Sequence, residues 1–155
     1  MRPRSFQLVT DGVRIARRGF TLIELLVAMA ALGILAAIAL PAFFEQLARA
    51  RRTDVQAALL EDAAYMQHYY ASHNAYTDTP PPRLPFTSTP RRGTASYAIT
   101  VGVPASDPTS FVLTATRSGA MSSDACGDFT YDNLGRRDLV ADTFAAGRSA
   151  ANCWR

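Results

Sequence analysis

The side chains best suited to chemistry in this chain of 155 residues are two cysteines, Cys126 and Cys153, with 26 residues between them. Two thiols can act as a redox pair, as a nucleophile beside a base, or as a structural disulfide. Their spacing is not that of a Cys-x-x-Cys redox pair, and no histidine lies close to either in the sequence. A catalytic thiol is therefore disfavoured. A disulfide requires that this part of the chain lies in an oxidising compartment.

Histidines and acidic residues supply the remaining candidate metal ligands. His68 and His73 are five residues apart, which does not place them on one helix face, and no acid or cysteine completes a ligand set nearby. Asp124, Asp128 and Asp132 recur every four residues but lack the pattern of a calcium loop. Phosphate loops, dinucleotide fingerprints, zincin motifs and nucleophile elbows are also missing from the sequence. We therefore predict no metal, no cofactor and no enzyme activity, with surface or packing roles for the histidines and solvated turn or strand-edge positions for the aspartates.

A predominantly apolar run of 25 residues, 20–44, contains one ionisable side chain, Glu24. As a helix it would extend roughly 37 Å, enough to cross a hydrocarbon core of about 30 Å with some tilt. Five arginines precede this run and three follow it closely. By the positive-inside rule the N-terminus is cytoplasmic and the body lies outside, where the two cysteines are expected to form a disulfide.

Two plainer interpretations of this run compete with a specialised one. A cleaved secretory signal has an apolar region of about 7 to 15 residues, which is shorter than this run. A single-span anchor also accommodates Glu24, because an acid in the first helical turn complements the helix dipole.

The residues around Glu24 favour the specialised interpretation. The segment RRGFTLIEL (17–25) resembles the class III signal of type IV prepilins, and the likeness extends closely to about Arg52. In that family a prepilin peptidase cuts after the glycine, and the new terminal phenylalanine is N-methylated. The resemblance implies a cleaved leader, residues 1–19, with the cut between Gly19 and Phe20 and methylation of Phe20.

The resemblance also assigns roles inside the helix. Once the leader is removed, the amine of Phe20 and the carboxylate of Glu24 lie about one helical turn apart. In a bundle of apolar helices both charges leave water, so pairing of Glu24 with a neighbouring subunit's amine would set the register of assembly. Gly33 and Pro41 mark a stretch that kinks, or that melts during filament formation; a bent transmembrane helix is the equal alternative.

The distribution of charge limits what the body can bind. The chain has 16 arginines, no lysine and 13 acidic residues, for a net charge of +3. The leader alone contributes +4, and the remaining 136 residues carry −1. The pairs Arg91-Arg92 and Arg136-Arg137 could contact DNA, but isolated basic pairs are commonly surface charge. DNA is therefore only a weakly supported partner.

Periodicity predicts the elements that follow the membrane segment. Residues 45–73 continue as an amphipathic helix, with an apolar stripe formed by Val55, Leu59, Ala63, Met66 and Tyr70 and an end at Asn74. The polar positions of this helix are expected to face solvent or other subunits: Arg51, Arg52, Asp54, Gln56, Glu61 and Gln67. Residues 74–94 are rich in Pro, Ser and Thr and are predicted to form an αβ-loop.

Four strand candidates occupy the region 95–155, namely 97–103, 110–117, 129–131 and 137–140. A long helix followed by a small antiparallel sheet is an α+β arrangement, which buries the apolar stripe. This is also the type IV pilin fold that the resemblance implies, and Cys126 and Cys153 would bound its C-terminal D-region. The chain-entropy model gives such a disulfide roughly 3.6 kcal/mol of stabilisation.

The sequence thus resembles a type IV pilus subunit, most like a minor pilin of the PilE kind. The resemblance implies insertion in the inner membrane and later extraction into an extracellular filament for adhesion, twitching motility or DNA uptake. Its expected partners are other pilin subunits, the prepilin peptidase, the inner-membrane assembly platform and, before assembly, membrane lipid. A major pilin and a type II secretion pseudopilin remain alternatives. A membrane-anchored periplasmic binding protein or enzyme is the alternative from a different class.

Overall fold

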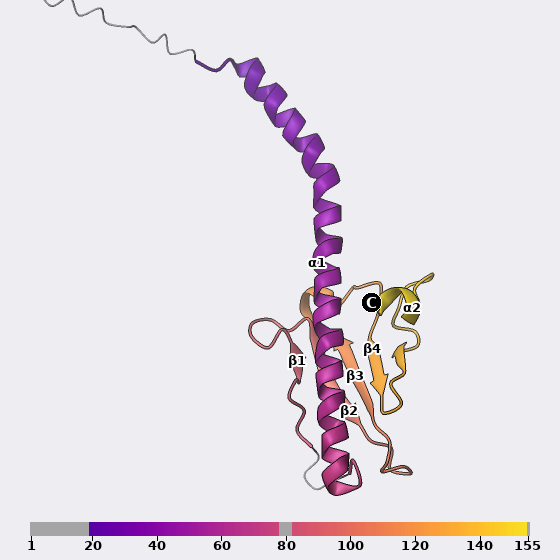
Figure 1. The fold of residues 1–155 in the computed structure, drawn as a ribbon. Coiled ribbons are helices and arrows are strands. Elements are labelled where there is room, and N and C mark those ends of the chain that lie inside the picture. Colours follow the sequence, from indigo (N-terminus) through magenta and orange to yellow (C-terminus); the bar gives the residue numbers. More distant parts are fainter. Residues whose placement is uncertain (1–18, 78–81, 155) are drawn as a thin grey trace, which may run out of the picture. The chain divides into compact units, whose positions relative to one another are not determined.

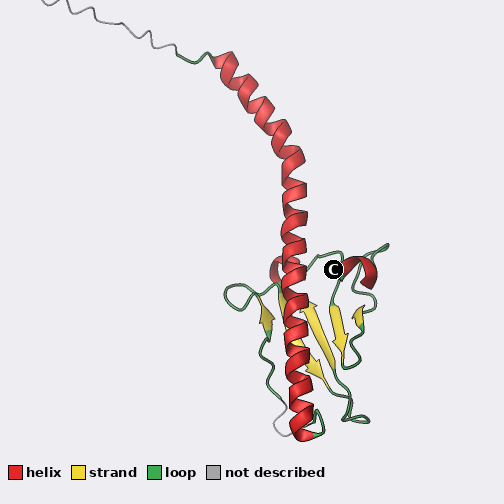
Figure 2. Ribbon diagram, in the orientation of Figure 1, coloured by secondary structure: helices red, strands yellow, loops and turns green. Residues whose placement is uncertain are grey.

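The computed structural model describes residues 19–77 and 82–154. Its elements are helix α1 (Leu22–His73), strands β1 (Ser88–Thr89), β2 (Tyr97–Gly102) and β3 (Val112–Arg117), the short 3-10 helix η1 (Gly119–Met121), strands β4 (Phe129–Asp132) and β5 (Arg137–Leu139), and helix α2 (Ala150–Cys153) (Figure 1; Figure 2). The chain divides between Leu40 and Pro41 into two units, and we describe the part of α1 in each unit separately.

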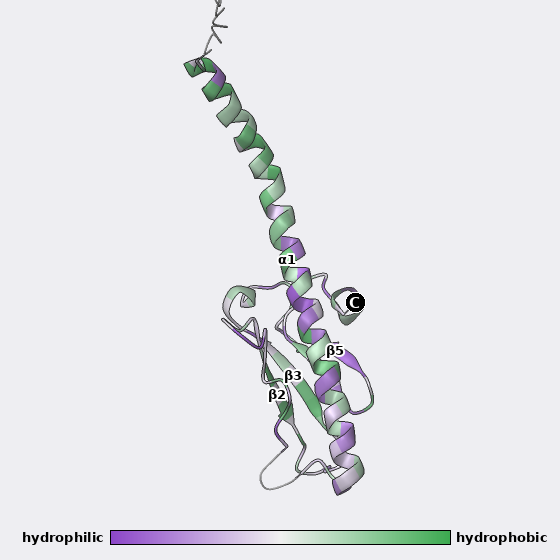
Figure 3. Cartoon of the chain, turned by 60° about the vertical axis from the view of Figure 1, so that its left-hand side comes forward, coloured by the Kyte–Doolittle hydropathy of each residue, from purple (hydrophilic) through white to green (hydrophobic). Residues whose placement is uncertain are grey.

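The part of α1 that precedes Pro41 is apolar on all sides (Figure 3). Each of its large apolar side chains is exposed, from Leu22 to Leu40. Within the described residues, α1 is the one helix long and apolar enough to cross a membrane. A helix that is apolar all round and buries none of this surface in its own chain requires an apolar surrounding, either lipid or other subunits.

From Pro41 onward, α1 is amphipathic and belongs to the second unit, which we call the head domain. Val55, Leu59 and Met66 are fully buried against the sheet, so the predicted apolar stripe is confirmed. The helix ends at His73 because Asn74 adopts a left-handed backbone, with φ of 56°, and its N–H donates to the Tyr70 carbonyl over 2.8 Å. Asparagine tolerates this conformation better than most residues, which explains the predicted end.

The five strands of the head domain form one antiparallel sheet in sequence order. β2 and β3 pair over six residues, from Tyr97 opposite Arg117 to Gly102 opposite Val112. Alternate side chains of the strands point to α1, and those of Tyr97, Leu113 and Phe129 are fully buried there. Figure 2 shows the head-domain part of α1 lying across one face of the sheet. The predicted α+β pilin fold is therefore confirmed.

The sheet contains one strand more than the four strand candidates of the sequence. β1 lies inside the segment 74–94, which the sequence predicts as a loop, and pairs Ser88 with Ala98 and Thr89 with Tyr97. A strand of two residues carries no detectable periodicity, so its pairing to β2, rather than a local pattern, defines it.

Candidate processing end and head-domain clamp

The residues around the expected cleavage point, 19–24, form what we call the processing end. Gly19 and Phe20 precede α1, and Phe20 is 84% exposed. A side chain added at Gly19 would meet no atom within 4 Å, so nothing in the chain's own packing requires glycine there. Cleavage between Gly19 and Phe20 stays a prediction. Arg17 and Arg18 lie outside the described residues.

Thr21 also belongs to the processing end, and its role was not predicted from the sequence. Its Oγ1 accepts a hydrogen bond from the backbone N–H of Glu24 over 3.2 Å. Thr-x-x-Glu before an apolar run is the sequence signature of a helix N-terminus, so this cap could have been found. The cap uses only the backbone of Glu24. The Glu24 carboxylate forms no ion pair within the part of the chain that the structure describes, and stays available to another molecule.

Gly33 and Pro41 both lie inside α1, which is helical at each of them. Gly33 has open space around it, since a side chain there would meet no atom within 4 Å. The kink or melting assigned to these two positions stays a prediction.

The C-terminus of the head domain is held by the Cys126–Cys153 disulfide, as predicted. Both cysteines are buried, and their Cα atoms are 5.7 Å apart. The bond joins the segment between η1 and β4 to helix α2. The next residue, Trp154, packs edge-on against Phe129 with ring centroids 5.5 Å apart, which places its side chain in the core.

Two polar residues of α1 complete this attachment, and we call them, with Asp124 and the disulfide, the head-domain clamp. The guanidinium of Arg52 donates from Nε to Asp124 Oδ2 over 3.0 Å, and a second bond runs from Nη2 to Oδ1. Gln56 Nε2 donates to the Cys153 carbonyl over 2.8 Å. The hydrogen bond to Asp124 raises the pKa of Arg52 against the opposing effect of burial.

The expectation that Arg52 and Gln56 face solvent or subunits was wrong, because both are buried. The positions of Arg52 and Gln56 in the sequence nevertheless indicate that they lie close to the buried face of the helix. Arg52 precedes the buried Val55 by three residues, and Gln56 precedes the buried Leu59 by three, so each lies beside the apolar stripe. Their partners, 72 and 97 residues away along the chain, could not be inferred from this spacing.

The three aspartates spaced by four residues are paired instead of solvated, which corrects that part of the expectation, while the strand-edge position is correct for Asp128, directly before β4, and for Asp132, at its end. Asp124 pairs with Arg52 in the clamp, and its side chain is 4% exposed. Asp128 accepts two hydrogen bonds of 2.9 Å from Arg117, one from the backbone N–H and one from Nε. Asp132 accepts from the backbone N–H groups of Leu134 and Arg136, and these bonds outweigh burial and lower its pKa. Each carboxylate therefore holds a loop of the head domain.

Asp62 is a buried acid that the sequence reading did not single out. It lies on α1, is completely buried, and accepts a hydrogen bond of 2.9 Å from the backbone N–H of Phe86. Its second carboxylate oxygen has no partner in the structure. Burial, with a smaller contribution from the charge of Glu61, raises the pKa of Asp62 to about 6.

The basic pairs considered for DNA differ in how far their side chains are engaged. The Arg91 guanidinium lies 3.7 Å from the ring centroid of Phe86, and Arg92 is exposed. Arg136 pairs with Asp132, and Arg137 lies 5.7 Å from the Trp154 ring. Arg92 is thus the member of the two pairs to which the structure gives no charged or aromatic partner.

Both histidines lie on the last turns of α1. The ring of His73 stacks on Tyr69 with centroids 4.1 Å apart, which is a packing role of the kind expected. Within the described residues, no group of three or more His, Cys, Asp or Glu side chains is arranged to hold a metal ion.

An N-terminal processing motif, an apolar helix and an α+β head domain closed by a C-terminal disulfide together define the class of type IV pilins. Comparison with known families agrees. The family described as type IV minor pilin ComP, DNA uptake sequence receptor, matches residues 41–130, and the prokaryotic N-terminal methylation motif matches residues 14–40. The chain belongs to this minor-pilin family, within the type IV pilins that the sequence resembles. The methylation motif and the apolar helix make it an inner-membrane protein before assembly, as predicted.

Individual relatives are pilins as well. The type IV major pilin protein PilE1 of Neisseria gonorrhoeae is 30% identical over 141 residues, covering 82% of this chain and 66% of the relative. A fimbrial protein of Moraxella nonliquefaciens is 61% identical over 36 residues, which is 23% of each chain. A solved type IV pilin from Shewanella oneidensis shares 23% identity over 63% of this chain and 97% of its own, with a TM-score of 0.45. The chain spans about two thirds or less of the length of these two curated relatives.

Proposed function

We propose that the protein is a structural subunit, a minor pilin, of a type IV pilus. The observation that carries this proposal is the combination of an accessible, capped processing end with an apolar helix segment that buries none of its surface in its own chain. In a filament, this surface is covered by the corresponding helices of other subunits. The head domain is closed by its own disulfide and stays folded when the helix leaves the lipid.

The expected path of the protein has three steps with different partners. A prepilin peptidase cuts between Gly19 and Phe20, and the new amine of Phe20 is methylated. An inner-membrane assembly platform then extracts the subunit into the filament. There the Glu24 carboxylate pairs with the amine of a neighbouring subunit, which sets the register. The resulting extracellular filament serves adhesion, twitching motility or DNA uptake, and no enzyme activity is expected of the subunit.

Mass spectrometry of the protein from its native cell tests the processing steps. We expect a mature chain that begins with N-methylated Phe20. An intact leader, or cleavage near Ala42 as in a secretory signal, would contradict the proposal.

Quantifying the subunit in sheared filaments then separates minor from major pilin, because a major pilin would dominate the filament mass. If the subunit were recovered only together with a type II secretion apparatus, and not in sheared filaments, a pseudopilin of that apparatus would be favoured instead.

Reception of DNA is a second candidate function, favoured by the family description, which names a DNA uptake sequence receptor. The side chains to test are Arg91 and Arg92, because Arg136 is engaged by Asp132. Phosphate contacts make DNA affinity fall steeply with salt. We expect duplex binding that weakens with salt and with the double substitution of Arg91 and Arg92 by Ala. Affinity unaffected by both changes would remove this candidate.

A further inference from the structure

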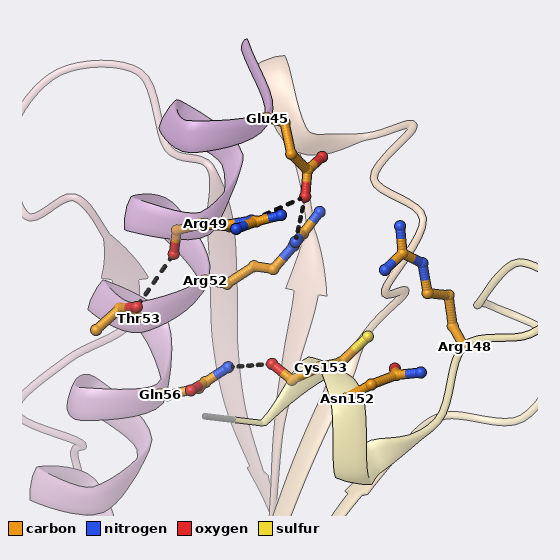
Figure 4. Close-up of a pocket in the computed structure, with 8 residues that line it drawn as sticks. All are labelled: Glu45, Arg49, Arg52, Thr53, Gln56, Arg148, Asn152 and Cys153. Atoms are coloured by element: carbon orange, nitrogen blue, oxygen red, sulfur yellow. Dashed lines mark hydrogen bonds and ion pairs between the residues drawn. The ribbon is translucent and has the colours of Figure 1, made fainter. Parts of the chain in front are cut away.

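A polar pocket lies in the head domain between α1 and the segment that leads into α2 (Figure 4). Its volume is about 250 Å³. We call it the arginine pocket; the residues that line it are Glu45, Arg49, Arg52, Thr53, Gln56, Arg148, Asn152 and Cys153. Three of these side chains are cationic and one is acidic, so the lining carries an excess of positive charge.

The three arginines differ in how far they are already paired. Each nitrogen of the Arg52 guanidinium already has a carboxylate partner. Nε and Nη2 donate to Asp124, and Nη1 donates to Glu45 over 3.3 Å. Arg49 contacts Glu45 only through Nε, and its side chain is 54% exposed. The Arg148 backbone N–H donates to the Ala145 carbonyl over 3.1 Å, but within the described residues its side chain forms neither a hydrogen bond nor an ion pair.

The Glu45 carboxylate cannot neutralise the pocket alone. The charges and hydrogen bonds of Arg49 and Arg52 lower its pKa against the effect of burial, so Glu45 is ionised and already shared by two guanidinium groups. Figure 4 shows Arg148 on the opposite wall from Arg49 and Arg52. The free N–H donors of Arg49 and Arg148 therefore border the same space, where an oxygen-rich anion would be held from two sides. Two arginines in this position suit a phosphate group, which guanidinium recognises with paired N–H donors.

The position of the pocket along the chain identifies the source of that phosphate. Glu45 directly follows the apolar run 20–44, and Arg49 is about 6 Å further along the helix axis. The polar layer on each side of a bilayer is roughly 5 to 7 Å thick. When the apolar run spans the membrane, Glu45 and Arg49 consequently lie at the depth of the lipid phosphates on the outer side.

We propose that the arginine pocket binds the phosphodiester headgroup of an anionic phospholipid, of the phosphatidylglycerol class, while the subunit is in the inner membrane. Arg49 and Arg148 provide the charge. Asn152 lines the same space; its Nδ2 donates one N–H to the Gly147 carbonyl over 3.2 Å, which leaves the second N–H as a further donor. An anionic headgroup is preferred to a zwitterionic one because it brings no cation toward the guanidinium groups. The bound lipid would hold the head domain at the membrane surface until extraction into the filament.

Native mass spectrometry of the processed, full-length protein in detergent tests this assignment, with phosphatidylglycerol and phosphatidylcholine of identical acyl chains as probes. We expect preferential retention of phosphatidylglycerol by the parent. Arg148→Gln and Arg49→Gln are each expected to lower this preference about fivefold, the change corresponding to one arginine near an anionic surface. Arg148→Lys should retain part of the preference, because it keeps the charge without the paired donors.

Arg51→Gln is the matched control, since Arg51 lies at the same depth of the helix but does not line the pocket. We expect it to leave the preference unchanged. A loss as large as that of Arg148→Gln would indicate general attraction of the helix to anionic lipid and would overturn the pocket. An unchanged preference in both Arg148→Gln and Arg49→Gln would overturn it too.

Two further binding measurements distinguish the lipid headgroup from other phosphate ligands. If inorganic phosphate or a short DNA duplex binds in a way that depends on Arg49 and Arg148, while lipid retention does not depend on these residues, the assignment to lipid is wrong. Circular dichroism and the intact mass of the disulfide-bonded chain establish that each variant is folded. Arg148 is bonded to no other described side chain, so its substitution should preserve the fold.

Discussion

Three polar side chains of α1, those of Arg52, Gln56 and Asp62, are buried although residues of these types are usually exposed. Each is matched by a group from a distant part of the head domain, and Asp62 by only one bond. A buried polar group destabilises the fold unless it is hydrogen-bonded. These residues therefore determine how the helix docks, and their substitution should have effects larger than those of exposed polar residues.

Arg52→Ala should destabilise the head domain strongly. It leaves Asp124 buried without its main charge partner, and breaking a buried ion pair costs about 3 to 5 kcal/mol. Arg49→Ala is the matched control, because Arg49 also pairs with Glu45 but is half exposed, and exposed pairs contribute about 0 to 1 kcal/mol. Thermal unfolding of the full-length protein in detergent, followed by circular dichroism, measures both. Equal changes in Tm would contradict the buried role of Arg52.

The pKa of Asp62 predicts an unusual dependence of stability on pH. Burial raises this pKa from 3.8 to about 6, so the folded state holds the proton more tightly than the unfolded chain does. The stabilisation from protonation is complete below about pH 4 and is lost as pH rises through 6. For this group alone, the Tm should fall between pH 4 and pH 6.5.

Asp62→Asn should remove that part of the pH dependence, because the amide does not titrate but its oxygen can still accept from the Phe86 N–H. Asp54→Asn, at an exposed acid of the same helix, should leave it intact. Thermal melts at a series of pH values compare the three proteins. If the parent and Asp62→Asn lose Tm in parallel from pH 4 to 6.5, Asp62 is not the titrating group.

At the scale of the elements, the sequence predicts the helix and strands that have a repeating hydrophobic pattern. It does not predict features that depend on partners far away along the chain. The apolar stripe of α1 and strands β2 to β5 follow hydrophobic periodicity, and the processing end follows a local motif. Strand β1 and the burial of Arg52 and Gln56 depend on partners that adjacent sequence does not specify. The Thr21 cap is predictable from the spacing of Thr21 to Glu24, because Thr-x-x-Glu before an apolar run is a signature of a helix N-terminus.

The last part of the D-region before Cys153, residues 145–152, contains no large apolar side chain, and the Cys126–Cys153 disulfide attaches this part to the head domain. Replacing both cysteines by Ala should lower the free energy of unfolding by about 3.6 kcal/mol, the loop-closure value for a ring of this size. Trp154 is the only tryptophan, and its Nε1 donates to the Asp138 carbonyl over 3.0 Å. Loss of the disulfide should therefore also shift tryptophan emission to longer wavelength.

The Gly127→Ala variant gives an independent check on the same region. Gly127 has φ of 74°, and an added Cβ would lie 2.6 Å from Thr143 Oγ1 and 2.8 Å from the Thr143 carbonyl carbon. The strain should loosen the D-region with the disulfide intact, lowering the Tm and shifting Trp154 emission in the same direction. Gly33→Ala, at an open helical position, should produce neither change. Unchanged emission in both Gly127→Ala and the cysteine variant would mean that Trp154 is held independently of this region.

At the scale of the whole molecule, the precursor and the mature chain have different charge. If residues 1–19 are removed as we propose, the net charge of +3 becomes −1 from side chains, and the basic pI then reflects orientation and processing and not the surface of the mature subunit. The apolar part of α1 then needs lipid before assembly and other subunits afterwards. Glu24 is the one ionisable side chain of the apolar run 20–44, so it enters both environments with this surface.

Assembly should consequently depend on the Glu24 charge more than on its place in the helix cap. Glu24→Gln keeps the backbone N–H that donates to Thr21 Oγ1, so the helix start should be preserved. It leaves the amine of a neighbouring subunit unpaired within the helix bundle, and a lone buried charge costs several kcal/mol. In cells that lack the parent subunit, we expect Glu24→Gln to be cleaved and inserted but recovered in sheared filaments at least about tenfold less.

Thr21→Val is the opposite control, because it removes the cap and keeps the carboxylate. Loss of an N-cap costs roughly 1 kcal/mol, which the long helix should tolerate, so assembly should stay close to that of the parent. Immunoblots of membrane and sheared fractions compare the two variants, and mass spectrometry establishes that both are processed at Phe20. If Thr21→Val were absent from filaments while Glu24→Gln assembled normally, the geometry of the helix start, and not the Glu24 charge, would set the register.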